Sequence, residues 1–491
     1  MRLVLSIVLI VTVPVLYGQN KIQSKISDAI VKNEATSHLT FLAADEMRGR
    51  YTGSPELDIA ANYLATQFRI LGARPHSSAP DFFQVVELEK IIPPTAVSLR
   101  IDTTVFRLRD DIVVMSGGSI SLEKELVFIG YGAKEDFEKA DVNDKIVVTF
   151  AGTPESKSPR RLMHDEAPAK ELLAQQYHAA ALVEIMTLPG VPWQTIVNNF
   201  SKARMNIHEP GRQSLPHFFM RNTESETLRS LQQTKRARGR LDVVASQPQI
   251  VRSENVIGLI EGTDARLKNE WIAITAHYDH IGVMKNSSPD SIYNGARDNA
   301  IGTVGLLEAA KFFAANPPKR SLLLVAFTGE EMGMLGSAWY AAHPAIPLNQ
   351  TVFDFNGDGG GYNDKTIATI IDFNRTTSDE LLKKGCEAYG LILKGDPAPE
   401  QNLYERSDNM NFAAKGVPAV NFSPGVKAFD PDVLKYYHQP ADEVGTLDMD
   451  YLEKFYRSFI YCIYLIANDP ERPHWKSGDK FESAAKALYA N

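Results

Sequence analysis

The chain has 491 residues, of which 44% are hydrophobic and 23% charged, and its 60 acidic and 52 basic side chains give a formal net charge of −8. This ordinary globular composition excludes a disordered or fibrous chain, and the length predicts two domains rather than one compact core. The acidic balance argues against nucleic acid or an anionic membrane as the main partner.

The start of the chain has the pattern of an export signal. Met1 and Arg2 precede an apolar run from Leu3 to Tyr17, which is typical of a secretory signal peptide and too short for a membrane span. We therefore expect residues 1–18 to be a signal peptide. The protein is expected to be secreted or periplasmic, with no stable membrane insertion after the signal is removed.

The N-terminal half of the chain contains two segments with different sequence patterns. Residues 19–105 open with helical patterns, among them Ser54–Gly72, where apolar residues recur at helical spacing. Residues 106–250 instead carry short β-rich runs, such as Leu126–Ile129 and Lys145–Phe150, with glycine-rich turns between them. We interpret 19–105 as the N-terminal part of the main domain and 106–250 as an inserted β-rich module.

After residue 251, apolar strands alternate with helices. The predicted strands are Asn255–Ile260, Trp271–Ala276, Leu322–Phe327 and Val352–Phe355, with helices over Thr303–Ala315 and Tyr451–Ala467. This alternation predicts an α/β fold with a doubly wound, mixed sheet flanked by helices. We assign 251–491 as the catalytic domain and expect its ligands at the carboxyl ends of the strands.

The chain has only two cysteines, Cys386 and Cys462. The sequence leaves open whether they form a disulfide. Two cysteines cannot make a thiolate zinc centre, so any metal must be held by histidines and carboxylates.

Histidine and carboxylate side chains follow the predicted strands where each strand leaves the sheet. His277 and Asp279 come directly after the strand that ends at Ala276, and they share one face. Asp279 can therefore hold the second ring nitrogen of a ligating His277. Asp298 lies where the helix over Thr303–Ala315 is about to begin.

Two further carboxylates, Glu330 and Glu331, follow the strand that ends at Phe327. Adjacent side chains point in different directions, so one can bind a metal while the other faces water or substrate. The next strand offers Asp354 within it and Asp358 just beyond it. Asp358 fits the position of a ligand at a strand end better, and Asp354 stays the alternative.

The last candidate is His438, in a proline-bounded loop before the closing helix. Together the acidic and histidine motifs predict a metal site. Carboxylate and imidazole ligands without thiolates suit zinc, with manganese or cobalt as possible substitutes.

The order His-x-Asp, Asp-Asn, Glu-Glu, Asp, Tyr-His resembles the di-zinc (co-catalytic) metallopeptidase family that includes aminopeptidase Y, bacterial leucyl aminopeptidases and glutamate carboxypeptidase. Leu42–Gly49 resembles the leading segment of that family. Val127–Gly132 and Asp144–Val148 look like its protease-associated (PA) insert. One departure is Asn409, which stands where the family commonly has histidine.

The resemblance implies two zinc ions per chain. His277 and Asp358 would bind one ion, Glu331 and His438 would bind the other, and Asp298 would bridge them.

The resemblance also implies roles for residues around the metals. Glu330 would be the general base, Asp279 would orient His277, and Tyr437 would help to stabilise the oxyanion. The peptide bond from Asp298 to the next residue is expected to be cis.

The implied function is that of a secreted zinc-dependent exopeptidase, an aminopeptidase that removes N-terminal residues from peptides with a hydroxide held between the metals. A carboxypeptidase or a glutaminyl cyclase of the same fold, and a non-catalytic receptor-like homologue, are the alternatives. The expected partners are peptide substrates, and the sequence leaves the oligomeric state and the role of the insert open.

Overall fold

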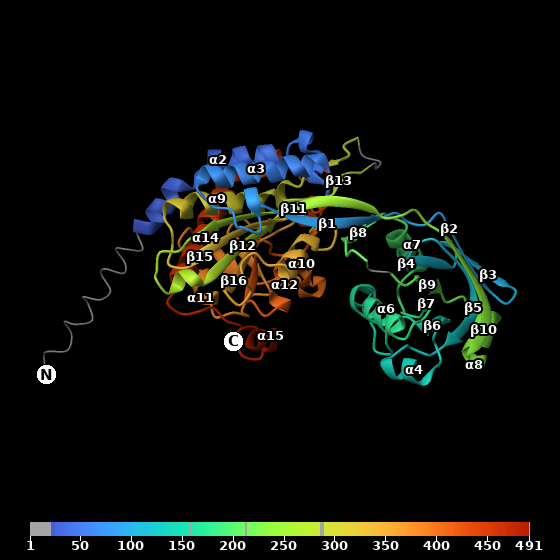
Figure 1. Cartoon of the computed structure of the whole chain (residues 1–491). Helices are drawn as coiled ribbons and strands as arrows, with labels where there is room; N and C mark the ends of the chain where they lie inside the picture. The colour runs from blue at the N-terminus through green and yellow to red at the C-terminus, as the bar shows by residue number, and fades with distance from the viewer. Residues whose placement is uncertain (1–20, 158, 212–213, 285–288, 491) are drawn as a thin grey trace. The chain divides into compact units, whose positions relative to one another are not determined.

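The structure is a computed structural model that describes residues 21–157, 159–211, 214–284 and 289–490 (Figure 1). The expected signal peptide, residues 1–18, lies outside the described residues. Among the helices that are described, none is long and apolar enough to cross a membrane.

The chain folds into two compact units, residues 1–87 with 252–491, and residues 88–251. The second unit begins at Leu88, earlier than the boundary that we expected at residue 106. The reason is strand pairing: β2 (Ala96–Ile101) is antiparallel to β10 (Arg236–Val244) along its whole length, so both strands belong to one sheet.

A mixed sheet forms the centre of the first unit, with the order β18-β17-β19-β16-β12-β15-β11-β1. Its strands are β1 (Phe83–Ile91), β11 (Gln249–Ile260), β12 (Trp271–His277), β15 (Ser321–Phe327), β16 (Thr351–Gly357), β17 (Ile367–Ile371), β18 (Ile392–Lys394) and β19 (Ala419–Pro424). β12 is parallel to both β15 and β16, whereas β11 is antiparallel to β15. The predicted mixed α/β sheet is confirmed.

Helices cover both faces of this sheet (Figure 1). One face carries α2 (Lys32–Leu42), α3 (Pro55–Leu71), α9 (Ile301–Ala315), α11 (Asp379–Glu387) and α14 (Met449–Asn468), and the other carries α10 (Leu335–Ala342) and α12 (Asn409–Ala414). Successive strand residues point to opposite faces. Leu322 and Leu324 accordingly lie in the core under α9, and Leu323 and Val325 lie in the core under α10. Both faces are apolar because both are buried.

The helix predicted over Ser54–Gly72 is confirmed as α3. Ser54 caps its first turn by accepting a hydrogen bond from the Leu57 amide at 3.3 Å, and Pro55 occupies the first helical position. Gly72 ends the helix with φ 95°, a left-handed conformation that glycine adopts without strain.

The helix α9 holds an acid inside the core. Both carboxylate oxygens of Glu308 are buried, and neither has a hydrogen-bond partner among the residues that the structure describes. Burial raises the pKa of Glu308 to about 8, against a modest lowering by the charge of Lys311. The Lys311 ammonium bonds instead to Glu34 and to the carbonyl of Ala29. Glu308 is therefore protonated in the folded state at neutral pH.

We expect Glu308→Gln to stabilise the protein at neutral and alkaline pH. The folded-state pKa is above the ordinary value of 4.5, so the folded state binds more protons than the unfolded state between pH 4.5 and about 8. The free energy of unfolding of the wild type consequently falls as pH rises through that window. The glutamine amide does not titrate, so the free energy of unfolding of the variant does not fall for this reason. Denaturant unfolding should give a gain of about 3 kcal/mol at pH 7 and little gain below pH 4.5. A pH-independent difference, or the same gain in the exposed Glu400→Gln control, would contradict the assignment.

The second unit has a mixed sheet of its own, with the order β3-β2-β10-β5-β6-β7-β9-β4. The strands not yet given are β3 (Thr104–Arg107), β4 (Ile112–Ser116), β5 (Ile120–Phe128), β6 (Ile146–Phe150), β7 (Ala181–Met186) and β9 (His217–Arg221), and β8 (Arg204–Ile207) pairs with the end of β1. Its helices are α4 (Lys134–Lys139), α5 (Pro159–Arg161), α6 (Ala167–Gln176), α7 (Trp193–Phe200) and α8 (Glu226–Thr234). The β-rich texture in the sequence thus corresponds to a sheet with helices packed on it.

A buried charged network lies inside the second unit. The Lys170 ammonium donates to Glu184 and to the carbonyls of Phe150 and Gly152. The other oxygen of Glu184 lies 2.8 Å from His217 Nε2. These charged groups satisfy one another, which indicates a structural role.

The two cysteines are free, and both are buried. Cys462 donates its thiol hydrogen to the carbonyl of Leu382 at 3.3 Å. They act as core side chains between α11 and α14.

Candidate metal centre

The predicted site residues of the first unit come together at one edge of its sheet. His277 ends β12, Glu331 follows β15 and Asp358 follows β16, and these three strands are parallel neighbours. Their carboxyl ends therefore meet. Asp298 precedes α9, and His438 follows α13 (Pro431–Leu434).

The carboxylate of Asp298 lies between two imidazoles. Its Oδ1 is 3.3 Å from His277 Nε2, and its Oδ2 is 3.2 Å from His438 Nε2. His277 Nε2 is also 3.4 Å from Asp358 Oδ1, and His438 Nε2 is 3.3 Å from Glu331 Oε2. The five side chains thus form two groups that share Asp298.

These spacings fit zinc. Two ligand atoms on one tetrahedral zinc, each about 2.0–2.2 Å from the ion, lie roughly 3.3 Å apart. The four distances within the two groups are 3.2–3.4 Å. Among the described residues, His277, Asp298 and Asp358 accordingly form one candidate metal site.

The charge of the cluster also fits a cation. Glu330, Glu331, Asp298 and Asp358 lie together, and no lysine or arginine of the described ranges forms an ion pair with them. Burial lowers the pKa of His438, but hydrogen bonding and charge from Asp298 and the charge of Glu331 raise it to about 9. The excess of carboxylates therefore attracts positive charge, which metal ions can supply.

Glu330 lies beside the cluster and takes no part in these ligand-like spacings. Burial raises the pKa of its carboxyl well above the ordinary value, and Asp358 and Glu331 add to the increase against the opposing charge of His277. A carboxylate with a raised pKa is suited to accept a proton near neutral pH.

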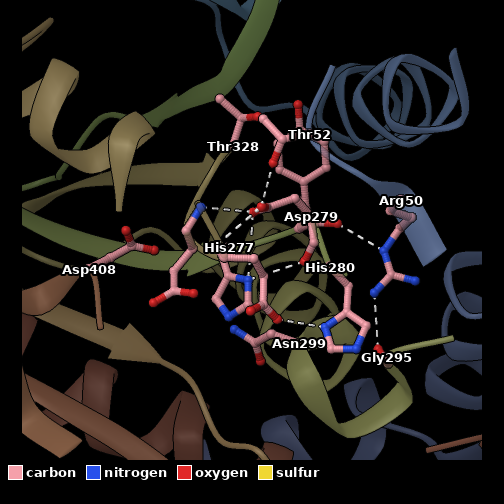
Figure 2. Close-up of polar contacts among 12 residues, drawn as sticks. Arg50, Thr52, His277, Asp279, His280, Gly295, Asn299, Thr328 and Asp408 are labelled. Atoms are coloured by element: carbon pink, nitrogen blue, oxygen red, sulfur yellow. Dashed lines mark hydrogen bonds and ion pairs between the residues drawn. The ribbon is translucent and has the colours of Figure 1, made fainter. Parts of the chain in front are cut away.

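Asp279 holds the turn after β15 (Figure 2). Its carboxylate accepts hydrogen bonds from the backbone N–H groups of Glu330 at 3.1 Å and Glu331 at 3.4 Å. The hydroxyl of Thr52 donates to the same carboxylate at 2.8 Å. His277 Nδ1 is 3.2 Å from the backbone carbonyl of Asp279 and 3.7 Å from its carboxylate. The hydrogen bond that orients His277 thus goes to the main chain of Asp279, and the carboxylate orients the glutamates.

The segment before α9 is held by Asp442. Its carboxylate accepts hydrogen bonds from the backbone N–H groups of Arg297 and Asp298 and from the Arg297 guanidinium. The peptide bond from Asp298 to Asn299 is cis, as expected. The Asn299 side chain donates to the carbonyl of Gly357 at 2.8 Å, which ties this segment to the end of β16.

The N-terminal segment also contributes to the site, which we did not expect in detail. The guanidinium of Arg50 donates to the carbonyls of Tyr278, Asn294 and Gly295 at 2.7–3.0 Å, and also to Leu42. Figure 2 shows the contact between Arg50 and Gly295. Arg50 therefore joins the loops after β12 and before α9. In the sequence, Arg50 stands within the motif region around Leu42–Gly49, but nothing there indicates which atoms it binds.

Asp354 and Asp358 have different surroundings. Asp354 is fully buried within β16, where Thr275 donates to its Oδ1 at 2.8 Å. Asp358 faces His277, and its Oδ2 accepts a hydrogen bond from the hydroxyl of Ser407. That hydroxyl accepts in turn from the Asn356 amide at 2.7 Å. Of the two aspartates, Asp358 is the one that contacts the cluster.

If the cluster binds two zinc ions, as the resemblance implies, we expect Asp358→Asn to lose one of them and Asp354→Asn to keep both. Burial raises the pKa of Asp354 well above the ordinary value and so favours its neutral form, and a neutral amide at this position should change little. Elemental analysis of the zinc content per chain measures the difference. If the Asp354 variant loses zinc and the Asp358 variant retains it, Asp354 is the metal ligand and Asp358 is not.

Tyr437 lies against the cluster. Its ring stacks on His438, with centroids 4.1 Å apart, and its hydroxyl oxygen accepts a hydrogen bond from Arg406 at 2.9 Å. The phenolic hydrogen therefore remains free to donate to another group. The side chain of His438 is 36% exposed, against 1% for His277, so the site opens to solvent on the Tyr437 side.

A mixed α/β sheet with two imidazoles and several carboxylates at its carboxyl edge defines a candidate metal-binding domain. Residues 255–463 match the model of Peptidase family M28. The matched segment is less than half of the chain and contains all five residues of the cluster, so the part of the chain that carries the site is similar to this peptidase family.

Known proteins are also similar in sequence to part of this chain. Aminopeptidase YwaD of Bacillus subtilis (strain 168) is 25% identical over 260 residues, which cover half of each protein. A vacuolar membrane protease of Ajellomyces dermatitidis is 30% identical over 215 residues, 40% of this chain and 20% of the protease. The chain thus spans half or less of the length of these curated relatives.

The fold is also similar to a solved structure. The aminopeptidase from Aneurinibacillus sp. strain AM-1 matches with a TM-score of 0.57 and 20% identity, over 92% of this chain and 97% of that one.

Proposed function

We propose that the protein is a zinc-dependent exopeptidase that binds two zinc ions and removes N-terminal residues from peptides. The observation that carries the proposal is the position of Asp298, with one carboxylate oxygen toward His277 and the other toward His438. A carboxylate that offers one oxygen to each of two three-residue groups could serve as a shared ligand if each group held a metal ion. His277 and Asp358 would bind one ion, and Glu331 and His438 the other.

Zinc ions at such a site would lower the pKa of a bound water and polarise the scissile carbonyl. The carboxylate of Glu330 would accept a proton from the attacking water and deliver it to the leaving amine. The phenolic hydrogen of Tyr437 would donate to the oxygen that becomes negative, since Arg406 occupies only an acceptor position of that hydroxyl. Asp279 would keep both glutamates in place through their backbone amides.

The names of the similar proteins favour an aminopeptidase within this class, because one curated relative and one solved structure are aminopeptidases. The substrates would be peptides with a free amino terminus. The apolar run at Leu3–Tyr17 supports action outside the cytoplasm.

The direct test compares aminoacyl p-nitroanilides with their N-acetylated counterparts and with peptides that offer a free carboxyl terminus. We expect release of p-nitroaniline only from substrates with a free amino group, loss of release with a zinc chelator, and recovery when zinc is added back. Release of C-terminal residues would make the protein a carboxypeptidase. Cyclisation of N-terminal glutamine without hydrolysis would make it a glutaminyl cyclase.

A further inference from the structure

A third histidine touches the cluster and has no role in the function proposed above. His280 is fully buried, and its Nδ1 is 2.7 Å from Glu331 Oε1. His280, Asp298 and Glu331 lie close enough together to form a second candidate metal group among the described residues. His280 is thus either a metal ligand or a residue that holds a ligand.

The distances distinguish these two roles. Contacts of the ligand type in this cluster are 3.2–3.4 Å long. The contact between His280 and Glu331 is 2.7 Å, a length typical of a charge-assisted hydrogen bond and too short for two atoms on one tetrahedral zinc.

The two oxygens of Glu331 face different partners. Oε2 lies 3.3 Å from His438 Nε2, on the side of the cluster, whereas Oε1 lies against His280. An ionised carboxylate only accepts hydrogen bonds, so a neutral His280 ring must carry its proton on Nδ1. Oε1 is then held by a hydrogen bond on the His280 side, and Oε2 is the oxygen that faces the candidate metal position beside His438.

The surrounding backbone fixes the His280 ring. A Cβ at Gly295 would lie 2.6 Å from two ring atoms of His280, so the backbone of the loop before α9 is in close contact with the imidazole. The backbone N–H of His280 donates to the carbonyl of Arg50 at 3.1 Å. The second ring nitrogen, Nε2, is buried and has no hydrogen-bond partner in the described part of the chain. A buried polar atom left unpaired is unfavourable for packing, so hydrophobic packing alone does not account for a histidine here.

We propose that His280 is a positioning residue that restricts Glu331 to one-oxygen binding of the second zinc ion. This inference rests on the proposed two-zinc function. Outer hydrogen bonds of this kind orient a ligand and strengthen metal binding. A one-oxygen carboxylate also leaves a coordination position free for water or substrate.

The test compares His280→Ala with His280→Asn, because the asparagine amide nitrogen is as far along the side chain as Nδ1 and can donate the same hydrogen bond. Zinc affinity is measured by chelator competition, and the cobalt-substituted proteins are compared by their absorption spectra. We expect the alanine variant to bind one zinc about 10- to 100-fold more weakly. The asparagine variant should remain within about threefold of wild type and keep the wild-type cobalt spectrum.

Each other outcome has a distinct meaning. Unchanged zinc affinity in the alanine variant overturns the positioning role. An equal loss in both variants, with a changed cobalt spectrum, makes the imidazole a metal ligand and also overturns it. Wild-type protein that binds fewer than two zinc ions refutes the proposed function instead. His343→Ala, an exposed histidine, is the matched control, and the melting temperatures of the metal-free variants identify any that fail to fold.

Discussion

Replacement of Glu330 by glutamine should lower kcat by about 10²- to 10⁴-fold while two zinc ions stay bound. The amide has the size of the carboxylate but cannot accept the proton that the attacking water loses. Zinc should be retained because Glu330 takes no part in the ligand-type spacings of the cluster, and its backbone N–H remains available to Asp279. Steady-state kinetics on an aminoacyl p-nitroanilide and zinc analysis of the same preparation measure both effects.

The exposed Glu400→Gln is the matched control for this substitution, and it should behave as wild type. A Glu330 variant with wild-type kcat would remove the general base from the proposed mechanism. A variant that also loses zinc would make Glu330 a ligand.

Asp298→Asn should lose both zinc ions, and its effect should exceed that of any other single ligand change. The carboxylate offers one oxygen to the His277 group and the other to the His438 group, so its loss weakens two sites at once. An amide supplies one neutral oxygen in place of two charged ones. We expect a zinc content well below one per chain at micromolar protein and no detectable hydrolysis.

Asp298→Asn is to be compared with Asp358→Asn, which changes one group only. If the Asp298 variant retains one zinc with wild-type affinity, Asp298 is not a bridge and the two sites are independent. The hydrogen bonds that Asp442 accepts from this segment should be little disturbed, because backbone N–H groups donate them.

Four strands of the main sheet, β11, β12, β15 and β16, could be predicted from the sequence because each contains an apolar run. β12 was expected to end at Ala276 and ends at His277, and β15 differs from its expectation by one residue at its start. Residues at the ends of parallel neighbours must meet, so the position of the cluster followed from local patterns alone.

The groups that hold the cluster were not predictable in the same way. Asp442 binds the backbone of Arg297, and Arg50 binds the carbonyl of Asn294, across sequence separations of 145 and 244 residues. A lone aspartate or arginine in a loop carries no local signal of its distant partner. His280 was visible in the motif that begins at His277, but its orientation toward Glu331 depends on the close approach of Gly295.

The boundary of the inserted unit was misplaced for a related reason. Residues between 88 and 105 resemble other short strands of either sheet, and only their partners decide where they belong. The pairing of β2 with β10 joins residues near position 100 to residues near position 240. Pairing across such distances is a property of the folded chain.

Because Arg50 joins segments that are far apart in the sequence, the part of the molecule around it can fold only late in synthesis. The residue leaves the ribosome early, yet its acceptor Asn294 is synthesised much later, after the whole inserted unit. Asp442 must follow before the segment at Asp298 is held at both sides. During translation the insert can therefore fold first. The apolar faces of α2 and α3 stay uncovered until the strands of the main sheet have been synthesised. Completion of the centre is then a late, long-range event, and the early helices expose apolar surface on the nascent chain until it occurs.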